Sequence, residues 1–214
     1  MPKPHHITDL IQRGENQTLD FKFEISDSRK IARTLVAFAN TDGGTLLIGV
    51  KDNGAIAGIR SGEEKYMVQM AAQMYTRPLV RYSTKEWVIG GKTVLEVMIS
   101  KGDQVPYLVL EPDGKWLAYI RAGDQNLLAN RVLLKVWEKQ AAGEEAVIQY
   151  TDKERQFLGY LEEKGTITLL ELCQLTDLSR SQAEDMLVDF ILMKVIEMVY
   201  TEKEVHYRFR ENLS

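Results

Sequence analysis

The stretch AFANTDGGTLLIGVKDNG, residues 37–54, constrains the fold of this chain more than any other segment. Small apolar residues lead into a polar turn with Gly43 and Gly44, and an apolar run follows. A tight-turn signal, Asp52-Asn53-Gly54, closes the stretch. Because glycine supplies the backbone conformations that sharp turns need, this order predicts a helix, a turn and a buried strand over 45–50.

Two nucleotide-binding motifs come close to this stretch, but neither fits. A phosphate loop needs Gly-x-x-x-x-Gly-Lys-Ser/Thr at the start of a helix. Here Gly44 and Gly49 have the right separation, but Lys51 comes one position late and no helix follows. An ATP lid with the pattern Asp-x-Gly-x-Gly would begin at Asp52, where Ile56 stands in place of the second glycine. Chain geometry therefore explains these glycines better than ATP binding does.

The flanking periodicity predicts a mixed domain of helices and strands over residues 1–140. Alternating polar and apolar residues over 18–23 indicate a strand. Helical spacing follows Ser28, which we expect to cap a helix over 29–39. The other expected elements are a returning strand at 55–59, a helix at 63–76, hairpins over 87–100 and 107–121, and a closing helix at 130–140. The expected fold class is α/β, an α+β arrangement around a mixed sheet.

The pattern changes after residues 141–150, which we interpret as a linker. Helices are expected over 152–164, 168–175 and 179–193, and two strands then flank the polar tip 201–204. Three helices followed by a two-stranded ribbon are typical of a winged helix-turn-helix domain, here over 151–214.

Charge is distributed unevenly between these two parts. The chain has a net charge of −4, so its overall charge does not indicate nucleic-acid binding. Residues 151–214 hold 8 basic and 13 acidic side chains, which leaves 19 and 18 for residues 1–150. The larger part is therefore the better place for a polyanion site.

Cysteine content and hydropathy narrow the cellular setting. A single cysteine, Cys173, excludes an internal disulfide and a cysteine-only zinc site. Residues 1–17 lack an apolar core of signal-peptide length, and no window approaches roughly eighteen consecutive apolar residues. We expect a cytoplasmic protein that does not contact membranes.

Four segments, in order along the chain, resemble one known family. They are GENQTLDFK, AFANTDGGTLLIGVKDNGAIAGI, GKTVLEVMI and AYIRAGDQN, within roughly residues 10–140. This pattern is similar to the AlbA_2 domain related to the Schlafen core. The resemblance implies a DNA-binding protein with a role in transcription regulation.

Schlafen relatives also include ribonucleases that cut tRNA and rRNA with three carboxylates. The resemblance places these at Glu15, Asp20 and Asp52, where they would hold Mg²⁺ or Mn²⁺ and activate water. Lys22 lies on the same strand face as Asp20 and would contact the scissile phosphate. Asp20 is shorter than the glutamate of the family motif. The alternative is that Glu15 and Asp52 are loop and turn residues and that Asp20 and Lys22 form a surface pair.

Basic side chains are the candidates for phosphate contacts. Arg29 and Arg33 lie one helical turn apart, and Arg121 lies in the AYIRAG segment. The expected nucleic-acid contacts are Lys22, Arg29, Lys30, Arg33, Lys51 and Arg121 in the first domain and Arg180 and Gln182 in the second.

The second domain leaves two roles open. Acidic residues follow Gln182 directly and repel phosphates, so this domain either makes dimer-assisted DNA contacts or binds proteins. Three functions follow for the whole chain: a DNA-binding regulator whose partner is DNA or RNA, a metal-dependent endoribonuclease acting on structured RNA such as tRNA, or a non-enzymatic scaffold that forms a homodimer. No cofactor is expected except Mg²⁺ or Mn²⁺ for the nuclease.

Overall fold

The computed structural model describes residues 5–60, 62–147, 150–201 and 204–211. The chain divides into two compact units, Met1–Ala129 and Asn130–Ser214, each with its own core. We call them unit 1 and unit 2.

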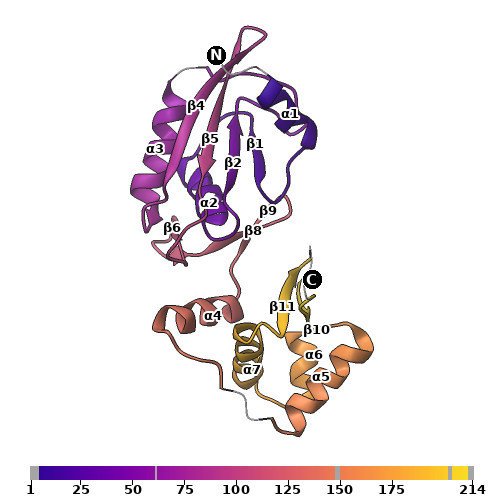
Figure 1. The fold of residues 1–214 in the computed structure, drawn as a ribbon. Helices are drawn as coiled ribbons and strands as arrows, with labels where there is room; N and C mark the ends of the chain where they lie inside the picture. Colours follow the sequence, from indigo (N-terminus) through magenta and orange to yellow (C-terminus); the bar gives the residue numbers. More distant parts are fainter. Residues whose placement is uncertain (1–4, 61, 148–149, 202–203, 212–214) are drawn as a thin grey trace. The chain divides into compact units, whose positions relative to one another are not determined.

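Unit 1 is built on a four-stranded sheet in the order β1-β2-β5-β4 (Figure 1). β1 (Leu19–Lys22) runs parallel to β2 (Gly44–Ile48). β4 (Tyr82–Ile89) and β5 (Lys92–Ile99) form an antiparallel hairpin, and β5 also pairs antiparallel with β2. The sheet is therefore mixed, which confirms the expected α+β fold class.

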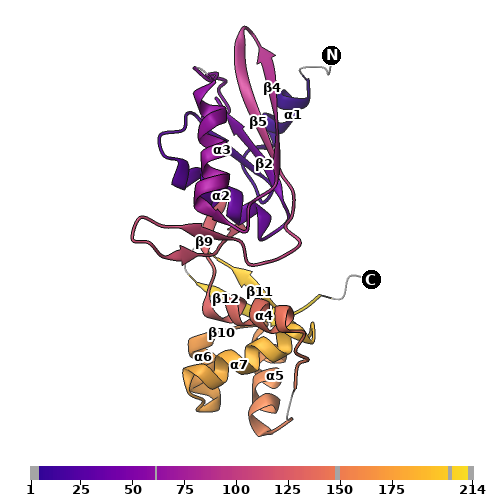
Figure 2. The same cartoon turned by 90° about the vertical axis from the view of Figure 1, so that its left-hand side faces the viewer.

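Helices lie on both faces of this sheet (Figure 2). α2 (Ser28–Ala39) and α3 (Glu63–Tyr75) pack on one face, and α1 (His5–Arg13) packs on the other. We expected Ser28 to cap α2, but the cap is Asp27, whose side chain accepts a hydrogen bond from the Arg29 backbone N–H at 2.8 Å. Ser28 is the first residue of the helix instead.

The central strand β2 is buried on both faces. Leu46 and Ile48 pack against α2 and α3, whereas Leu47 packs in the core that contains Ile7 of α1. A strand covered on both sides needs a continuous apolar run, because no side chain faces water. The run in the sequence therefore reflects the position of β2 between two layers of helix.

Two smaller sheets complete unit 1. They consist of β3 (Thr76–Arg77), β6 (Leu108–Leu110) and β7 (Trp116–Leu117) in one, and β8 (Tyr119–Ala122) and β9 (Gln125–Leu128) in the other. Asn40, directly after α2, joins both to the core. Its Nδ2 donates to the backbone carbonyls of Tyr107 and Tyr119, each at 2.8 Å, and its Oδ1 accepts from the Tyr107 N–H at 2.7 Å.

The segment after β2 forms the expected turn but not the expected returning strand. Gly54 N–H donates to the Lys51 carbonyl at 2.7 Å, which closes the turn. Residues 55–59 form no regular strand. They make one isolated bridge, between Val50 and Ile56, and the N–H groups of Ala57 and Gly58 both donate to the Gly49 carbonyl, at 2.8 and 2.9 Å. Gly49 has a φ of 93°, and a Cβ there would lie 2.8 Å from the backbone of Gly58. The close approach of these two backbones explains the glycine at position 49.

Unit 2 contains the expected three helices and two strands, with one additional strand. The elements are α5 (Asp152–Lys164), β10 (Thr166–Thr168), α6 (Leu169–Thr176), α7 (Arg180–Leu192), β11 (Ile196–Tyr200) and β12 (Val205–Phe209). The strands form an antiparallel sheet in the order β10-β12-β11. None of the described helices in either unit is long and apolar enough to cross a membrane.

α4 (Arg131–Ala142) was expected to close the first domain, but it packs in unit 2. Val132 and Val136 lie in the same core as the residues of α7. Two ion pairs also join α4 to α7, Lys135 to Asp185 at 2.8 Å and Lys139 to Asp189 at 2.7 Å. The apolar face of α4 packs in the core with α7, and its lysines pair with acids of α7. The boundary between the two units therefore lies near residue 130, before α4.

Candidate nucleic-acid interface

Glu15 lies in the loop that covers the free edge of β1. This strand pairs on one side only, with β2. The Glu15 Oε1 accepts a hydrogen bond from the Phe21 backbone N–H at 2.9 Å, and the Asn16 carbonyl accepts one from the Leu19 N–H at 3.3 Å. The loop thereby satisfies backbone donors that an edge strand would leave open. Glu15 thus has a structural role.

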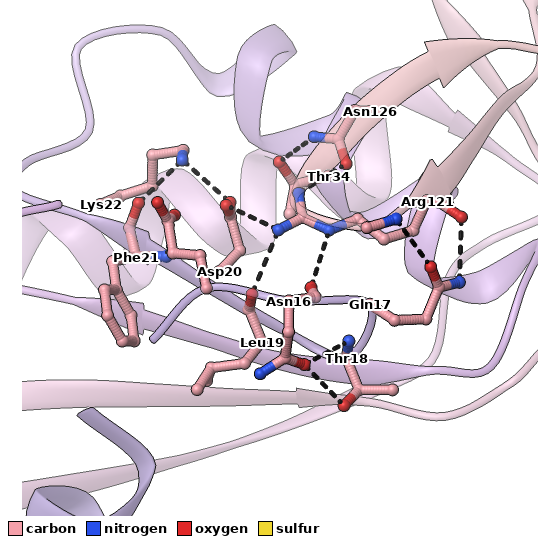
Figure 3. Close-up of polar contacts among 12 residues, drawn as sticks. Asn16, Gln17, Thr18, Leu19, Asp20, Phe21, Lys22, Thr34, Arg121 and Asn126 are labelled. Carbon is pink, nitrogen blue, oxygen red and sulfur yellow. Dashed lines mark hydrogen bonds and ion pairs between the residues drawn. The ribbon is translucent and has the colours of Figure 1, made fainter. Parts of the chain in front are cut away.

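Asp20 is buried and pairs with Arg121 of β8 (Figure 3). The Arg121 Nη2 lies 3.2 Å from the Asp20 Oδ1, and the two side chains are 1% and 3% exposed, respectively. Arg121 also donates to the backbone carbonyls of Asn16 at 3.2 Å and Leu19 at 3.1 Å and to the Asn126 Oδ1 at 3.0 Å. We expected Arg121 to contact phosphate. A guanidinium enclosed in this way instead joins β8 to β1.

Lys22 points to the same side of β1 as Asp20, as the strand alternation predicts (Figure 3). Its Nζ lies 2.9 Å from the Asp20 Oδ2 and donates a hydrogen bond to the Phe21 carbonyl at 2.7 Å. The contact with Oδ2 is an ion pair. The Lys22 side chain is 38% exposed, so this pair extends from the interior to the surface.

The Glu15 carboxyl group is held next to Asp20. Burial raises the pKa of Glu15, and a hydrogen bond from the protonated Glu15 to Asp20 raises it further. The Phe21 N–H and the charge of Lys22 act in the opposite direction. The two carboxyl groups and Lys22 therefore form one electrostatically linked cluster, which we call the Asp20 cluster.

The third expected carboxylate is not part of the Asp20 cluster. Asp52 is exposed in the turn after β2. Within the described ranges, no three His, Cys, Asp or Glu side chains form a group that could hold a metal ion. Arg121 and Lys22 already balance the charge of Asp20. These residues do not fit the expected three-carboxylate site for Mg²⁺ or Mn²⁺.

An exposed aromatic ring lies directly after β1. Phe23 is 39% exposed, and its ring centroid is 5.5 Å from the Lys51 Nζ and 6.0 Å from the Arg60 guanidinium. Arg60 also pairs with Glu24 at 3.3 Å. Because β1 and β2 are parallel and in register, the residues that follow them meet at one end of the sheet. Lys51 is thereby brought beside Phe23.

Phe23 and Arg60 were not among the residues that we expected to bind nucleic acid. Alternation placed Phe23 on the apolar face of the strand with Leu19 and Phe21, which are buried. The strand ends at Lys22, so Phe23 leaves that face. No local signal marks Phe23 as exposed, because Lys22 and Glu24 on either side continue the same alternation.

The basic residues of α2 have separate environments. Lys30 is exposed, and the Arg29 guanidinium lies 5.0 Å from the Tyr75 ring centroid. Arg33 makes a two-pronged ion pair with Glu111, in which Nε donates to Oε1 at 2.7 Å and Nη2 donates to Oε2. The hydrogen bond with Arg33 lowers the pKa of Glu111. Arg33 therefore already has an anionic partner within unit 1.

The two expected contacts in unit 2 lie at the start of α7. The Arg180 Nε donates to the Glu184 Oε1 at 3.2 Å. The Gln182 Oε1 accepts hydrogen bonds from the Ser179 backbone N–H at 3.1 Å and from its hydroxyl at 2.8 Å. Both side chains are exposed, but each already takes part in the structure of the helix.

Comparison with known proteins identifies one family. The family model described as Schlafen, AlbA_2 matches residues 15–130, just over half of the 214-residue chain. No match was found among the curated proteins.

Two solved structures are similar to part of the chain. The DIP2311 protein from Corynebacterium diphtheriae is 20% identical with a TM-score of 0.43, and the match covers 63% of this chain and 26% of that protein. The second is the N-terminal domain of a protein from Nitrosomonas europaea described as a putative ATP-dependent DNA helicase RecG-related protein. It is 22% identical with a TM-score of 0.42, and the match covers 61% of this chain and 97% of that domain. The chain thus spans about a quarter of the length of the first of these proteins.

Proposed function

We propose that this chain, which belongs to the Schlafen AlbA_2 family, binds nucleic acid at the end of its central sheet. The proposed contact surface consists of Lys22, Phe23, Lys51 and Arg60, and we call it the Phe23 surface. The observation that carries the proposal is the exposed Phe23 ring with two cations beside it.

Such an arrangement suits a single-stranded segment. Aromatic side chains that bind single strands stack on bases, and adjacent cations contact the phosphates. Lys51 supplies an exposed ammonium group beside the Phe23 ring, and the partly exposed Lys22 precedes Phe23 in the chain with its ammonium group held by Asp20. A base stacked on the Phe23 ring would bring the phosphates on either side of that base close to these cations.

The Phe23 surface has few cations, so we infer modest affinity that depends on salt. Arg60 is partly neutralised by Glu24 and Lys22 by Asp20. Each phosphate contact contributes about 0.7–0.9 to the slope of log affinity against log salt concentration. A slope of roughly two to three is expected from this surface.

We further propose that unit 2 is a winged helix-turn-helix domain and that the chain is a DNA-binding transcription regulator. The helix order α5, α6, α7 followed by the β11–β12 hairpin supports this assignment. The start of α7, with Arg180 and Gln182, would then be the end nearest to DNA. Because Arg180 pairs with Glu184 and residues 151–214 are acidic overall, we infer that unit 1 supplies most of the affinity.

The proposal is tested by the fluorescence anisotropy of labelled single-stranded DNA, single-stranded RNA and duplex DNA over a salt series. Replacing Phe23 with Ala is expected to weaken single-strand binding by about 5- to 150-fold, the range for loss of one base–aromatic stack. Phe23→Tyr keeps the ring and is expected to bind nearly as well as the original chain. Lys51→Ala is expected to reduce the salt slope by about one contact.

Lys115→Ala is the matched control. Lys115 is also exposed and also next to an acid, Asp113. It lies between β6 and β7, whereas Lys51 follows β2 and lies beside the Phe23 ring. Unchanged affinity in Phe23→Ala, or equal losses in Lys51→Ala and Lys115→Ala, would show that nucleic acid binds elsewhere or only through overall charge.

A further inference from the structure

A cavity of about 470 Å³ lies within unit 2, and residues of α4, α6, α7 and β12 line it. Small-molecule sites in proteins have volumes of about 300–1,000 Å³, so this cavity is large enough for an organic ligand. Its apolar lining includes Leu169, Leu170, Cys173 and Val205. Leu170 is 67% exposed, which places a large apolar side chain at a surface that a ligand can reach.

Cations outnumber acids on the helical side of this cavity. The Glu184 carboxylate is 2% exposed, and three cations approach it: Lys135 at 3.0 Å, Arg180 at 3.2 Å and Arg131 at 3.8 Å. Lys135 has a second partner, Asp185, at 2.8 Å. Arg131 and Arg180 therefore share one buried carboxylate, and each of their side chains is 75% exposed. One positive charge at the cavity lacks an acidic counterpart among these helical residues.

The helices themselves add to this positive potential. The N-cap residues Asn130 of α4 and Thr168 of α6 line the cavity, and so does Arg180, the first residue of α7. The N-terminus of a helix carries a partial positive charge from its unpaired N–H groups. α4 and α7 thus begin beside the two arginines. At the start of α6, the Glu171 carboxylate accepts hydrogen bonds from the Thr168 backbone N–H at 2.8 Å and from its hydroxyl at 2.9 Å, which offsets the positive end of that helix.

We propose that this cavity binds a small amphipathic carboxylate. The carboxylate pairs with Arg131 and Arg180, and the apolar body of the ligand lies on Leu169, Leu170 and Cys173. The remaining acid of the lining is Glu204, whose carboxylate lies 3.6 Å from the His206 Nε2. Glu204 opposes an anionic ligand, so its charge limits the affinity. This site is separate from the Phe23 surface. Arg180 also lies at the end of α7 that we place nearest to DNA, so ligand binding is measured in the absence of nucleic acid.

Cys173 provides a reporter within the site, because it is the only cysteine in the chain. The full chain is treated with a neutral thiol reagent, 4,4′-dithiodipyridine, and the rate of Cys173 modification is followed by absorbance. The probes are octanoate and 4-phenylbutyrate, with octanamide, 4-phenylbutyramide and octylamine as their uncharged and cationic counterparts. Saturating carboxylate is expected to slow the modification by about tenfold or more, with little protection from the amides and none from the amine.

Charge variants test the assignment of the polar groups. Arg180→Gln is expected to weaken octanoate binding by about ten- to hundredfold, the range for one lost hydrogen bond to a charged group. Glu204→Gln removes a repelling charge and is expected to tighten binding. Arg155→Gln is the matched control, because Arg155 is an exposed arginine of α5 that pairs with an acid but does not line the cavity.

Three results would overturn the proposal. One is equal protection of Cys173 by octanoate and octanamide, which would mean that only the apolar walls bind. Another is unchanged octanoate affinity in Arg180→Gln, provided that circular dichroism shows a folded variant. The third is absence of protection by every probe at millimolar concentration. Loss of nucleic-acid binding in Phe23→Ala would leave the outcome at Cys173 unaffected, so the two proposals fail separately.

Discussion

Asp20 and Arg121, 101 positions apart in the chain, form an ion pair of 3.2 Å that is almost completely shielded from solvent. The pair joins β1 to β8, and the remaining Arg121 donors hold the loop before β1. Both residues lie in segments that resemble the family motifs. Their role in this structure is to hold those segments together and to position Lys22 and Phe23 at the end of β1.

Removing the arginine should destabilise unit 1. Arg121→Met leaves Asp20 as a buried charge with only Lys22 as partner, and loss of one member of a buried pair costs about 3–5 kcal/mol. Urea denaturation followed by circular dichroism measures the loss. The double variant Asp20→Asn/Arg121→Met should recover part of it, because no buried charge then remains. Equal stability of Arg121→Met and the original chain would contradict the structural role.

The pKa of Glu15 should respond to Lys22. The positive charge of Lys22 lowers this pKa, although burial and Asp20 raise it overall. Lys22→Met should therefore raise the pKa of Glu15 further, as measured by NMR titration of its side-chain carboxyl carbon. Because the folded pKa lies above the ordinary value of 4.5, the protonated form favours folding, and this contribution is lost as the pH rises through the folded pKa. A fall in the pKa in Lys22→Met would contradict the arrangement of the Asp20 cluster.

The Arg33–Glu111 pair should make stability depend on pH in the opposite direction. The hydrogen bond with Arg33 holds the pKa of Glu111 below its ordinary value of 4.5, so the pair stabilises the fold above that value and loses its effect as the pH falls through the folded pKa. Arg33→Met should cost about 1.5–3 kcal/mol at neutral pH. Urea denaturation at several pH values should show this difference shrinking in acid, and a constant difference would contradict the ionic contribution.

The position of α4 predicts where the chain can be divided. A fragment of residues 130–214 should unfold cooperatively, because it retains Val132, Val136 and the ion pairs with α7. A fragment of residues 151–214 loses these contacts and should be markedly less stable. Thermal denaturation by circular dichroism compares the two. Equal stability would place α4 outside the cooperative unit.

Local patterns were sufficient to predict most elements of the fold. The continuous apolar run over 45–50 indicated β2, and alternation indicated β1, because each depends on which faces of the strand are covered. The prediction of a returning strand over 55–59 was wrong. The sequence of this segment suits a strand, but two successive N–H groups, of Ala57 and Gly58, donate to the same Gly49 carbonyl, which a regular ladder does not allow.

The candidate site was less predictable, because its key relationships are non-local. Spacing placed Asp20 and Lys22 on one strand face. It did not predict the burial of Asp20, because that burial depends on an arginine from β8. The position of α4 likewise depends on complementary partners in α7, which no local pattern reveals. Phe23 was assigned to the wrong side because the strand ends one residue earlier than its alternation suggests.

The most direct test of the proposed function is an NMR titration of the full chain with a short single-stranded oligonucleotide at low salt. Backbone amide shifts should change at Lys22, Phe23, Lys51 and Arg60, and they should return to their free values as salt is added. The Phe23 ring protons should move upfield, as stacking on a base requires. Shifts confined to the start of α7, or no shifts near Phe23 at saturation, would contradict binding at the Phe23 surface.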